Sequence, residues 1–297
     1  MKVLVLGKSG QVATALVSAR KGVPTGWNVE AWGRQQLNLS DVGGIYERVV
    51  RSGAAGIINA AAYTAVDKAE REATEAAMLN SEAPAEVARA ARQMNIPFVH
   101  ISTDYVFSGD KSTPYVETDP IGPVSVYGRT KAEGESRVMQ AHPGATILRT
   151  AWVFHEHGTN FVKTMLRLGR EREEIRVVAD QYGNPTYAGD IANACLQIIA
   201  KTAAGESGTG GIFHFSGSGH TTWHGFAVEI FTQAARLGLK VPACVLPITT
   251  ADYPTPARRP ANSRFDCTKI HNDLGIVPPD WRPALASCIE YVIKAEP

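Results

Sequence analysis

The residues Lys2-Val-Leu-Val-Leu6 and, directly after them, Gly7-Lys-Ser-Gly10-Gln-Val-Ala13 say most about how this chain folds. The first run is mostly apolar and β-branched, which predicts a buried strand, and a helix is expected from Val12 onward. A strand, a glycine turn and a helix together let a pyrophosphate approach the backbone and the helix N-terminus. This unit therefore predicts a dinucleotide-binding turn, the alternative being an ordinary tight turn of an α/β protein.

Apolar strands alternate with amphipathic helices through the first half of the chain. The further expected strands are 28–32, 55–59, 97–102 and 145–149. The expected helices are 42–51, 74–94 and one that begins near Tyr127. This alternation predicts an α/β fold with a Rossmann-type, doubly wound parallel sheet and right-handed crossovers. Ligands of such sheets bind at the carboxyl ends of the strands.

The pattern changes after about residue 152, where helices mix with short strands and loops rich in Gly and Pro, such as 253–260. We therefore expect a dinucleotide-binding Rossmann domain over 1–152 and a smaller C-terminal α/β portion over 153–297 that mainly binds substrate. Whether elements of the second portion cross back to the first domain is left open.

Tyr127-Gly-Arg-Thr-Lys131 places a phenol and an ammonium one helical turn apart, on the same face of a helix. A nearby cation favours the phenolate and lowers the pKa of the tyrosine, which suits a general acid or base. The hydroxyls of Ser102 and Thr103, at the end of a strand, are expected to hydrogen-bond the same substrate oxygen. Taken alone the motif is weak, because surface helices also carry it by chance.

Composition narrows the class of protein. The chain has 297 residues, of which 44% are hydrophobic, and a formal net charge of +1. That charge makes no electrostatic case for nucleic acid or an anionic membrane. Four widely spaced cysteines, without a C-x-x-C pair, are typical of a reduced cytosolic protein. No apolar run approaches the length of a membrane span, so we expect a soluble, cytoplasmic protein.

The cofactor preference follows from the end of the second strand. In NAD-specific folds an acidic side chain there binds the ribose, whereas an arginine accommodates a 2′-phosphate. Here Trp32-Gly33-Arg34-Gln35-Gln36 contains no acid, and none precedes Asp41. Arg34 therefore predicts NADPH, with NADH as an accepted alternative; the other interpretation is a solvated loop arginine.

Several blocks, in order along nearly the whole chain, resemble the dTDP-4-dehydrorhamnose reductase family of extended short-chain dehydrogenases/reductases. The blocks are Gly7-x-x-Gly10-Gln-Val, Asn59-Ala-Ala-Ala-Tyr-Thr64, Ser102-Thr-Asp-Tyr-Val-Phe107, Tyr127-Gly-x-Thr-Lys131 and Arg149-Thr-Ala-Trp-Val153. The glycine turn and the Tyr-x-x-x-Lys motif specify only the superfamily, whereas the other blocks are more specific.

The resemblance implies reduction of the C4 ketone of dTDP-4-dehydro-L-rhamnose, a nucleotide sugar, to dTDP-L-rhamnose. Tyr127 is the implied proton donor, Thr103 bonds the ketone oxygen, and Lys131 lowers the pKa of Tyr127 and bonds the nicotinamide ribose. Taken together with the glycine turn and Arg34, the expected cofactor contacts are Gly7, Gly10, Gln11, Val12, Gly33, Arg34, Asn38, Leu39, Ala61, Ala62, Tyr63, Thr64, Tyr127 and Lys131. The implied substrate contacts are Thr103, Asp104, Trp152, Trp223 and Arg259.

Some of these residues also have a purely structural interpretation. Trp152 could be a core aromatic, Trp223 a hydrophobic staple at a helix start, and Arg259 a loop cap. Some members of the family form a homodimer around a divalent cation held by glutamates. Ala13-Thr-Ala15 occupies the corresponding stretch of the first helix here, so no metal is predicted and a homodimer is left open.

Two alternatives remain at this level. One is a related nucleotide-sugar epimerase or dehydratase with a resident NAD; Tyr105, where dehydratases commonly carry a carboxylate, argues against it. The other is a non-catalytic, NADP-binding regulatory subunit of the methionine adenosyltransferase type. The presence of Thr103, Tyr127 and Lys131 argues for an enzyme instead.

Overall fold

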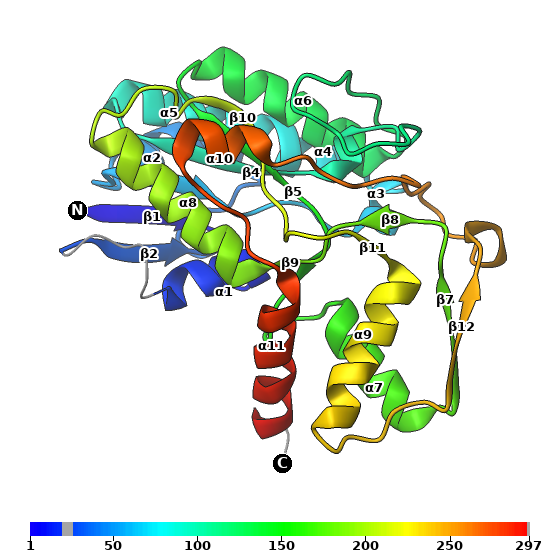
Figure 1. Ribbon diagram of the computed structural model, residues 1–297. Helices are drawn as coiled ribbons and strands as arrows, with labels where there is room; N and C mark the ends of the chain where they lie inside the picture. Colours follow the sequence, from blue (N-terminus) through cyan, green and yellow to red (C-terminus); the bar gives the residue numbers. More distant parts are fainter. Residues whose placement is uncertain (20–25, 296–297) are drawn as a thin grey trace.

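The computed structural model describes residues 1–19 and 26–295 and is built around a six-stranded sheet (Figure 1). The strand order is β2-β1-β3-β4-β5-β10, and every pairing between neighbours is parallel. The strands are β1 (Lys2–Leu6), β2 (Asn28–Trp32), β3 (Gly56–Asn59), β4 (Phe98–Thr103), β5 (Thr146–Thr150) and β10 (Gly211–His214). The predicted α/β class with a doubly wound parallel sheet is confirmed.

Helices cover both faces of this sheet. One face carries α1 (Gln11–Ser18), α8 (Ala188–Ala203) and α10 (Thr268–Leu274), and the other carries α2 (Val42–Val50), α5 (Ala83–Met94) and α6 (Val126–Ala141). Side chains of β1 alternate between the two cores: Val3 and Val5 pack with Leu16 and Ile191, whereas Leu4 packs under α2 and α5. Burial on both faces explains why β1 reads as a continuous apolar run.

The strand order places a topological switch point between β1 and β3, because the chain leaves β1 toward β2 and returns on its other side at β3. Gly7 ends β1 at this point with φ of +108°, and a Cβ there would lie 3.3 Å from the backbone nitrogen of Ala61. Both the positive φ and the close approach require glycine. The crevice expected at such a switch point therefore opens above the Gly7 turn.

Between β3 and β4 the chain forms one interrupted helical stretch. It consists of α3 (Val66–Ala69), α4 (Ala73–Ala77), a π-helical turn η1 (Met78–Glu82) and then α5. This region matches the helix expected over 74–94. The turn η1 contacts α6, so it supports the helix that carries Tyr127 and Lys131.

The smaller portion packs beyond the carboxyl ends of the strands (Figure 1). Its helices are α7 (Phe161–Glu171), α9 (Trp223–Arg236) and α11 (Trp281–Ala295). Its strand pairs are β6 (Val153–Phe154) with β9 (Thr186–Tyr187), β7 (Glu174–Val178) with β12 (Cys244–Ile248), and β8 (Tyr182–Gly183) with β11 (Thr221–Thr222). Phe154, Phe226 and Trp281 belong to its own apolar core. The predicted smaller α/β portion is therefore present.

Three elements that follow residue 152 return to the sheet. The strand β10 pairs with β5, α8 packs against α1, and α10 packs against β10. Residues 188–216 and 265–276 therefore belong with the Rossmann portion in space, which is the crossing that the sequence left open. No helix in the described ranges is both long enough and apolar enough to cross a bilayer.

Candidate active site

Two adjoining cavities lie at the carboxyl ends of the strands. The first has a volume of about 590 Å³ and reaches from the glycine turn to Trp152 and Trp223; the second, of about 540 Å³, lies between the glycine turn and 32–40. They share six lining residues: Ser9, Gly10, Ala60, Ala61, Ala62 and Thr64. The two cavities therefore form one cleft across the switch point.

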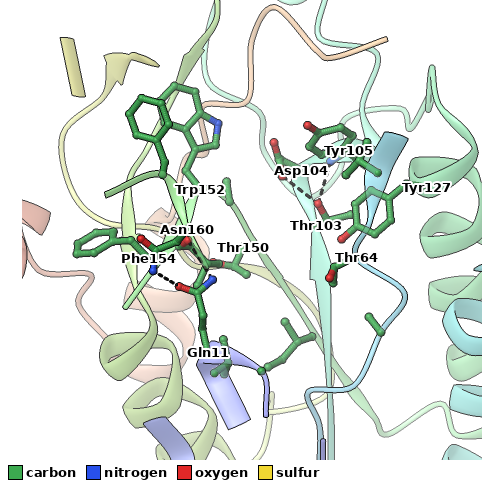
Figure 2. Close-up of a pocket in the computed structure, with 18 of the residues that line it drawn as sticks. Gln11, Thr64, Thr103, Asp104, Tyr105, Tyr127, Thr150, Trp152, Phe154 and Asn160 are labelled. Atoms are coloured by element: carbon green, nitrogen blue, oxygen red, sulfur yellow. Dashed lines mark hydrogen bonds between the residues drawn. The ribbon is translucent and has the colours of Figure 1, made fainter. Parts of the chain in front are cut away.

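Thr103 ends β4 on one wall of the first cavity (Figure 2). Its hydroxyl accepts a hydrogen bond from the Tyr105 backbone N–H at 3.3 Å and donates one to Asp104 Oδ1 at 2.9 Å. It thereby caps the 3₁₀ turn η2 (Asp104–Val106). This capping interaction fixes the position of the Thr103 hydroxyl beside the phenol of Tyr127.

Tyr127 is the second residue of α6, whose N-cap Ser125 accepts a hydrogen bond from the Gly128 N–H at 3.1 Å. A Cβ at Gly128 would collide with the carbonyl oxygen of Tyr105, so glycine lets α6 approach η2 closely. The ring of Tyr105 meets the Tyr127 ring edge-on at 5.4 Å. The phenol of Tyr127 is thus held at the cavity wall between η2 and α6.

The pKa of Tyr127 differs from the sequence-based expectation. Burial raises it to about 12, the Thr103 hydroxyl partly opposes that rise, and Asp104 adds to it. Lys131 does not lower it as expected, because its ammonium is directed toward β4. Lys131 Nζ donates to the Ile101 carbonyl at 2.7 Å and lies 3.3 Å from His100 Nε2. Desolvation of the phenol dominates at this site.

Lys131 is 2% exposed but lines the first cavity. Burial lowers the pKa of its ammonium to about 8, and the negative charge of Glu135, one turn further along α6, acts in the opposite direction. Lys131 therefore titrates close to neutral pH, far from the value of a solvated lysine.

Asp104 is 3% exposed, and burial raises its pKa to about 6 against the opposing hydroxyls of Ser263 and Thr103. Within the described part of the chain its Oδ2 has no hydrogen-bond partner. A buried carboxylate oxygen without a partner is costly, and this one belongs to a residue that lines the first cavity. Asp104 is therefore suited to accept a hydrogen bond from a ligand hydroxyl.

An aromatic wall faces Thr103 and Tyr127 across the first cavity (Figure 2). Trp152 and Trp223 stack with ring centroids 3.6 Å apart and an angle of 9° between the rings, and Phe161 packs against Trp223. Trp152 has a φ of +48°, one of two positive values among the described non-glycine residues. Such backbone strain in a cleft commonly marks a ligand site.

Arg259 comes from the proline-rich segment 253–260 and forms a two-pronged ion pair with Asp67 of α3, at 3.1 and 2.8 Å. Asp67 also accepts from the Ala257 N–H at 3.1 Å, and these hydrogen bonds hold its pKa below the usual range. The pair connects the C-terminal segment to the Rossmann portion beside the first cavity, which Arg259 lines.

The second cavity is lined by Gly33, Arg34, Asn38 and Leu39 together with Lys8 and the glycine turn, and its lining includes no Asp or Glu. Glu30, the acidic residue of β2, instead accepts from Trp32 Nε1 at 2.7 Å and pairs with Lys2 at 3.3 Å. Next to the glycine turn, among the described residues, no side chain caps the N-terminus of α1, so backbone N–H groups remain for an anion. This lining is suited to the pyrophosphate of a dinucleotide.

Comparison with known proteins agrees with this geometry. A family model described as the RmlD substrate binding domain matches residues 1–293. A dTDP-4-dehydrorhamnose reductase of Aggregatibacter actinomycetemcomitans is 45% identical over 292 residues, which are 98% of this chain and 99% of that protein. The chain belongs to the dTDP-4-dehydrorhamnose reductase family.

Solved structures with the same family name share the fold of this chain. The dTDP-4-dehydrorhamnose reductase of Clostridium acetobutylicum aligns with a TM-score of 0.90 and 35% identity, covering 99% of this chain and 100% of its own. That of Bacillus anthracis, solved in complex with NADP, aligns with a TM-score of 0.87 and 34% identity, covering 99% of each chain. The fold of the family therefore extends over the whole of this chain.

The cleft of this dTDP-4-dehydrorhamnose reductase family member gathers nearly all the predicted site residues. The first cavity is lined by Gly10, Gln11, Val12, Ala61, Ala62, Thr64, Thr103, Asp104, Tyr127, Lys131, Trp152, Trp223 and Arg259. The second adds Gly7, Gly33, Arg34, Asn38 and Leu39. Tyr63 lines neither cavity: its hydroxyl donates to Glu72, and its backbone N–H donates to Asn80 Oδ1 at 2.8 Å.

Some residues of this cleft were not expected from the sequence. Asn160 caps α7 by accepting from the Lys163 N–H, and its amide donates to Gln11 Oε1 at 2.9 Å, linking the two portions (Figure 2). An asparagine before an apolar helix is a recognisable N-cap signal, and Lys8 stands inside the glycine turn itself, so both could have been found. In the described ranges no three His, Cys, Asp or Glu side chains gather as a metal site would require.

Proposed function

We propose that this chain reduces the C4 ketone of dTDP-4-dehydro-L-rhamnose to dTDP-L-rhamnose, with NADPH as the hydride donor. The observation that carries the proposal is the convergence of Thr103, Tyr127 and Lys131 in one cavity that adjoins the glycine turn. Relatives over the whole length of the chain bear the name of this reductase. An intact proton-donating set favours the enzyme over a non-catalytic subunit.

The second cavity supports NADPH as the cofactor. The glycine turn and the α1 N-terminus would hold the pyrophosphate, while Arg34 and Lys8 would meet the 2′-phosphate. The Bacillus anthracis relative was solved with NADP. When bound, the cofactor supplies the hydride; the protein contributes position, proton transfer and exclusion of water.

Tyr127 is the proposed proton donor to the ketone oxygen. With a pKa of about 12 the phenol stays protonated at neutral pH, and it is still a far stronger acid than the alcohol that the reduction forms. Lys131, with a pKa of about 8, is in turn more acidic than the phenol, so returning a proton from its ammonium to a Tyr127 phenolate is downhill. The pKa order therefore favours proton flow from Lys131 through Tyr127 to the substrate.

The rest of the first cavity suits a nucleotide sugar. Asp104 Oδ2 would accept from a sugar hydroxyl, and the stacked Trp152 and Trp223 would cover the apolar face of the sugar. Arg259 would bind the diphosphate through charge-assisted hydrogen bonds. The guanidinium of Arg259 already forms two hydrogen bonds with the Asp67 carboxylate. Phosphate binding at Arg259 would therefore replace the carboxylate by the diphosphate of the substrate.

Loss of NADPH absorbance with enzymatically generated dTDP-4-dehydro-L-rhamnose tests the proposal. Tyr127→Phe removes the donated proton and is expected to lower kcat by about 100-fold to 10,000-fold. Tyr46→Phe, which removes a hydroxyl on α2 away from both cavities, is the matched control and should keep the parent rate. Full turnover by Tyr127→Phe would assign the proton to another group.

The same preparation separates the alternatives. A folded protein that binds NADPH but turns over no ketone would contradict the reductase function. A stoichiometric NAD that stays bound through purification would favour an epimerase or dehydratase, and a stoichiometric protein partner would favour the regulatory subunit.

A further inference from the structure

A row of buried hydrogen-bonded side chains lies behind the wall of the first cavity, and two of them, Asn59 and His100, have no part in the function proposed so far. It runs from Asn59 at the end of β3 through His100 of β4 to Lys131 of α6. Asn59 Nδ2 lies 3.0 Å from His100 Nδ1, and His100 Nε2 lies 3.3 Å from Lys131 Nζ. His100 is fully buried and lines neither cavity, so it reaches the reaction only through Lys131.

The direction of the first hydrogen bond is set by the backbone. The Ala61 N–H donates to Asn59 Oδ1 at 3.2 Å, which leaves the amide nitrogen of Asn59 to face His100. The reverse amide orientation would oppose two donors, N–H against NH₂. His100 Nδ1 must therefore accept. Burial lowers the pKa of His100 well below its usual value, so the ring is neutral. Because Nδ1 accepts, the ring proton lies on Nε2.

That Nε2–H group points at Lys131 Nζ. An ammonium has only donors, whereas a neutral amine has a lone pair that can accept from Nε2–H. An amine could also keep its hydrogen bond to the Ile101 carbonyl at 2.7 Å and still direct one N–H into the cavity. The hydrogen bonds of Asn59, His100 and Lys131 are thus best satisfied by the neutral amine, so this arrangement favours release of a proton from the ammonium that Lys131 carries below its pKa.

Other charged or titratable groups near Lys131 are few. Glu135 follows one turn later on α6 and favours the ammonium, but Arg149 of β5 neutralises it through hydrogen bonds of 2.9 and 2.7 Å. Ser102 of β4 also donates to Glu135. Tyr127 precedes Lys131 by one turn and is protonated. Among the described residues, His100 is the titratable side chain with a ring nitrogen within hydrogen-bond distance of Lys131 Nζ.

We propose that His100, oriented by Asn59, is a positioning residue that donates its Nε2–H to Lys131 Nζ and destabilises the ammonium. Lys131 is thereby kept ready to release a proton toward Tyr127 and to regain one from water through the cavity. The kinetic consequence rests on the proposed reductase function, but the hydrogen-bond direction does not.

Nitrogen NMR of the full chain labelled in histidine tests the hydrogen-bond direction without any substrate. The expected spectrum shows His100 as the neutral Nε2–H tautomer across the pH range of folding, identified by its loss in His100→Gln. In Asn59→Asp, a carboxylate replaces the donating amide and still accepts from Ala61, so the His100 proton should move to Nδ1. An Nδ1–H tautomer in the parent protein would overturn the inference.

The pH profile of kcat/KM for ketone reduction tests the consequence. Activity should fall as pH rises through the pKa of Lys131. Asn59→Asp turns Nε2 into an acceptor, and His100→Gln offers a carbonyl oxygen without adding charge. Each variant should move the basic limb of the kcat/KM profile upward by about one pH unit, which corresponds to a tenfold gain in the proton affinity of Lys131.

His214→Gln is the matched control, because it removes a second fully buried histidine whose ring contacts Arg149 and not Lys131. Its basic limb should stay at the parent position. If Asn59→Asp and His100→Gln both lower kcat/KM without shifting the basic limb of its pH profile, the role of His100 is merely structural and the proposal is overturned. A shift in only one of the two variants also overturns it. If the protein turns over no ketone, the reductase function is contradicted. The tautomer measurement still decides the direction of the hydrogen bond between His100 and Lys131.

Discussion

At the scale of single residues, burial decides the charge states of the site. Tyr127, Lys131 and Asp104 each have a pKa moved toward the neutral form, and burial is the largest cause for all three. Charge pairs matter less, because desolvation acts on every ionised group in the cleft while most of their partners are hydroxyls or carbonyls. Burial therefore brings the pKa values of Asp104 and Lys131 closer to neutral pH than they are in water.

The effect of burial on Asp104 can be measured through the pH dependence of the free energy of unfolding. The folded-state pKa of Asp104, about 6, exceeds its ordinary value of 3.8, so the folded state binds the proton more tightly, and the stability of the parent falls as pH rises from about 4 to 6. Asp104→Asn lacks this penalty. Its free energy of unfolding should therefore gain about 2 kcal/mol relative to the parent between pH 4 and 7. Urea unfolding at both pH values measures the difference, and a constant difference would contradict the assigned burial cost.

Arg34 is expected to select the cofactor. Arg34→Ala removes a cation from a cavity whose lining holds no carboxylate, so the KM for NADPH should rise about tenfold while the KM for NADH stays near the parent value. Steady-state rates with both cofactors check this. Arg51→Ala, an exposed arginine at the end of α2, is the control and should leave the ratio unchanged. An equal rise for both cofactors would assign Arg34 to general binding.

At the scale of elements, a buried ion pair holds α6, the helix that carries Tyr127 and Lys131. Glu135 of α6 forms two hydrogen bonds with Arg149 of β5, with side-chain exposures of 4% and 2%, and also accepts from Ser102 of β4. Since α6 carries both Tyr127 and Lys131, this interaction fixes the position of these two residues relative to β4, the strand that ends at Thr103. A surface pair could not do this, because solvent would screen it.

Breaking this pair should cost stability. Glu135→Gln leaves Arg149 buried and charged without its partner, so the free energy of unfolding is expected to drop by about 3–5 kcal/mol. Glu133→Gln, on the same helix, breaks an exposed pair with Arg137 and should cost less than about 1 kcal/mol. Chemical denaturation of both variants makes the comparison. Equal losses would mean that the buried pair contributes no more than the exposed one.

At the scale of the whole molecule, the two portions share their cores. The sheet face under α1 is completed by α8, whose Ile191, Cys195 and Ile199 are fully buried and come from the second half of the chain. Beside the cleft, Asn160 with Gln11 and Arg259 with Asp67 join the portions through side chains. The cleft thus lies between the two portions, and the core of the Rossmann portion needs residues from both halves of the chain.

A fragment of residues 1–152 should therefore not fold cooperatively. It would expose the apolar face that α8 covers and would lose β10 from the edge of the sheet. Thermal unfolding followed by circular dichroism, with amide NMR dispersion as a second probe, is expected to show no cooperative transition for the fragment, while the full chain shows one. A sharp transition in the fragment would make the Rossmann portion an independent domain.

Much of the fold was accessible from the sequence because its signals are local. Residues 28–32 were predicted as a strand and form β2, and the helix expected over 42–51 is α2. The strand β10 was not anticipated, since Gly211-Ile-Phe-His214 is too short for periodicity to separate it from the preceding loop. Of the site, the motifs predicted the lining of the cleft, but Asn160, Lys8 and His100 were not expected.

The amino-acid sequence alone determined the parallel sheet, the glycine turn and the residues that meet at its carboxyl edge, because strand alternation, helix periodicity and motif spacing depend on neighbours along the chain. Only the tertiary structure decided the stacking of Trp152 on Trp223, the return of α8 and β10 to the sheet, and the chain from Asn59 to Lys131. It also decided that burial raises the pKa of Tyr127 where the motif alone predicted a fall. The physical reason is that desolvation and hydrogen-bond direction depend on groups far apart in sequence, which come together only when the layers pack.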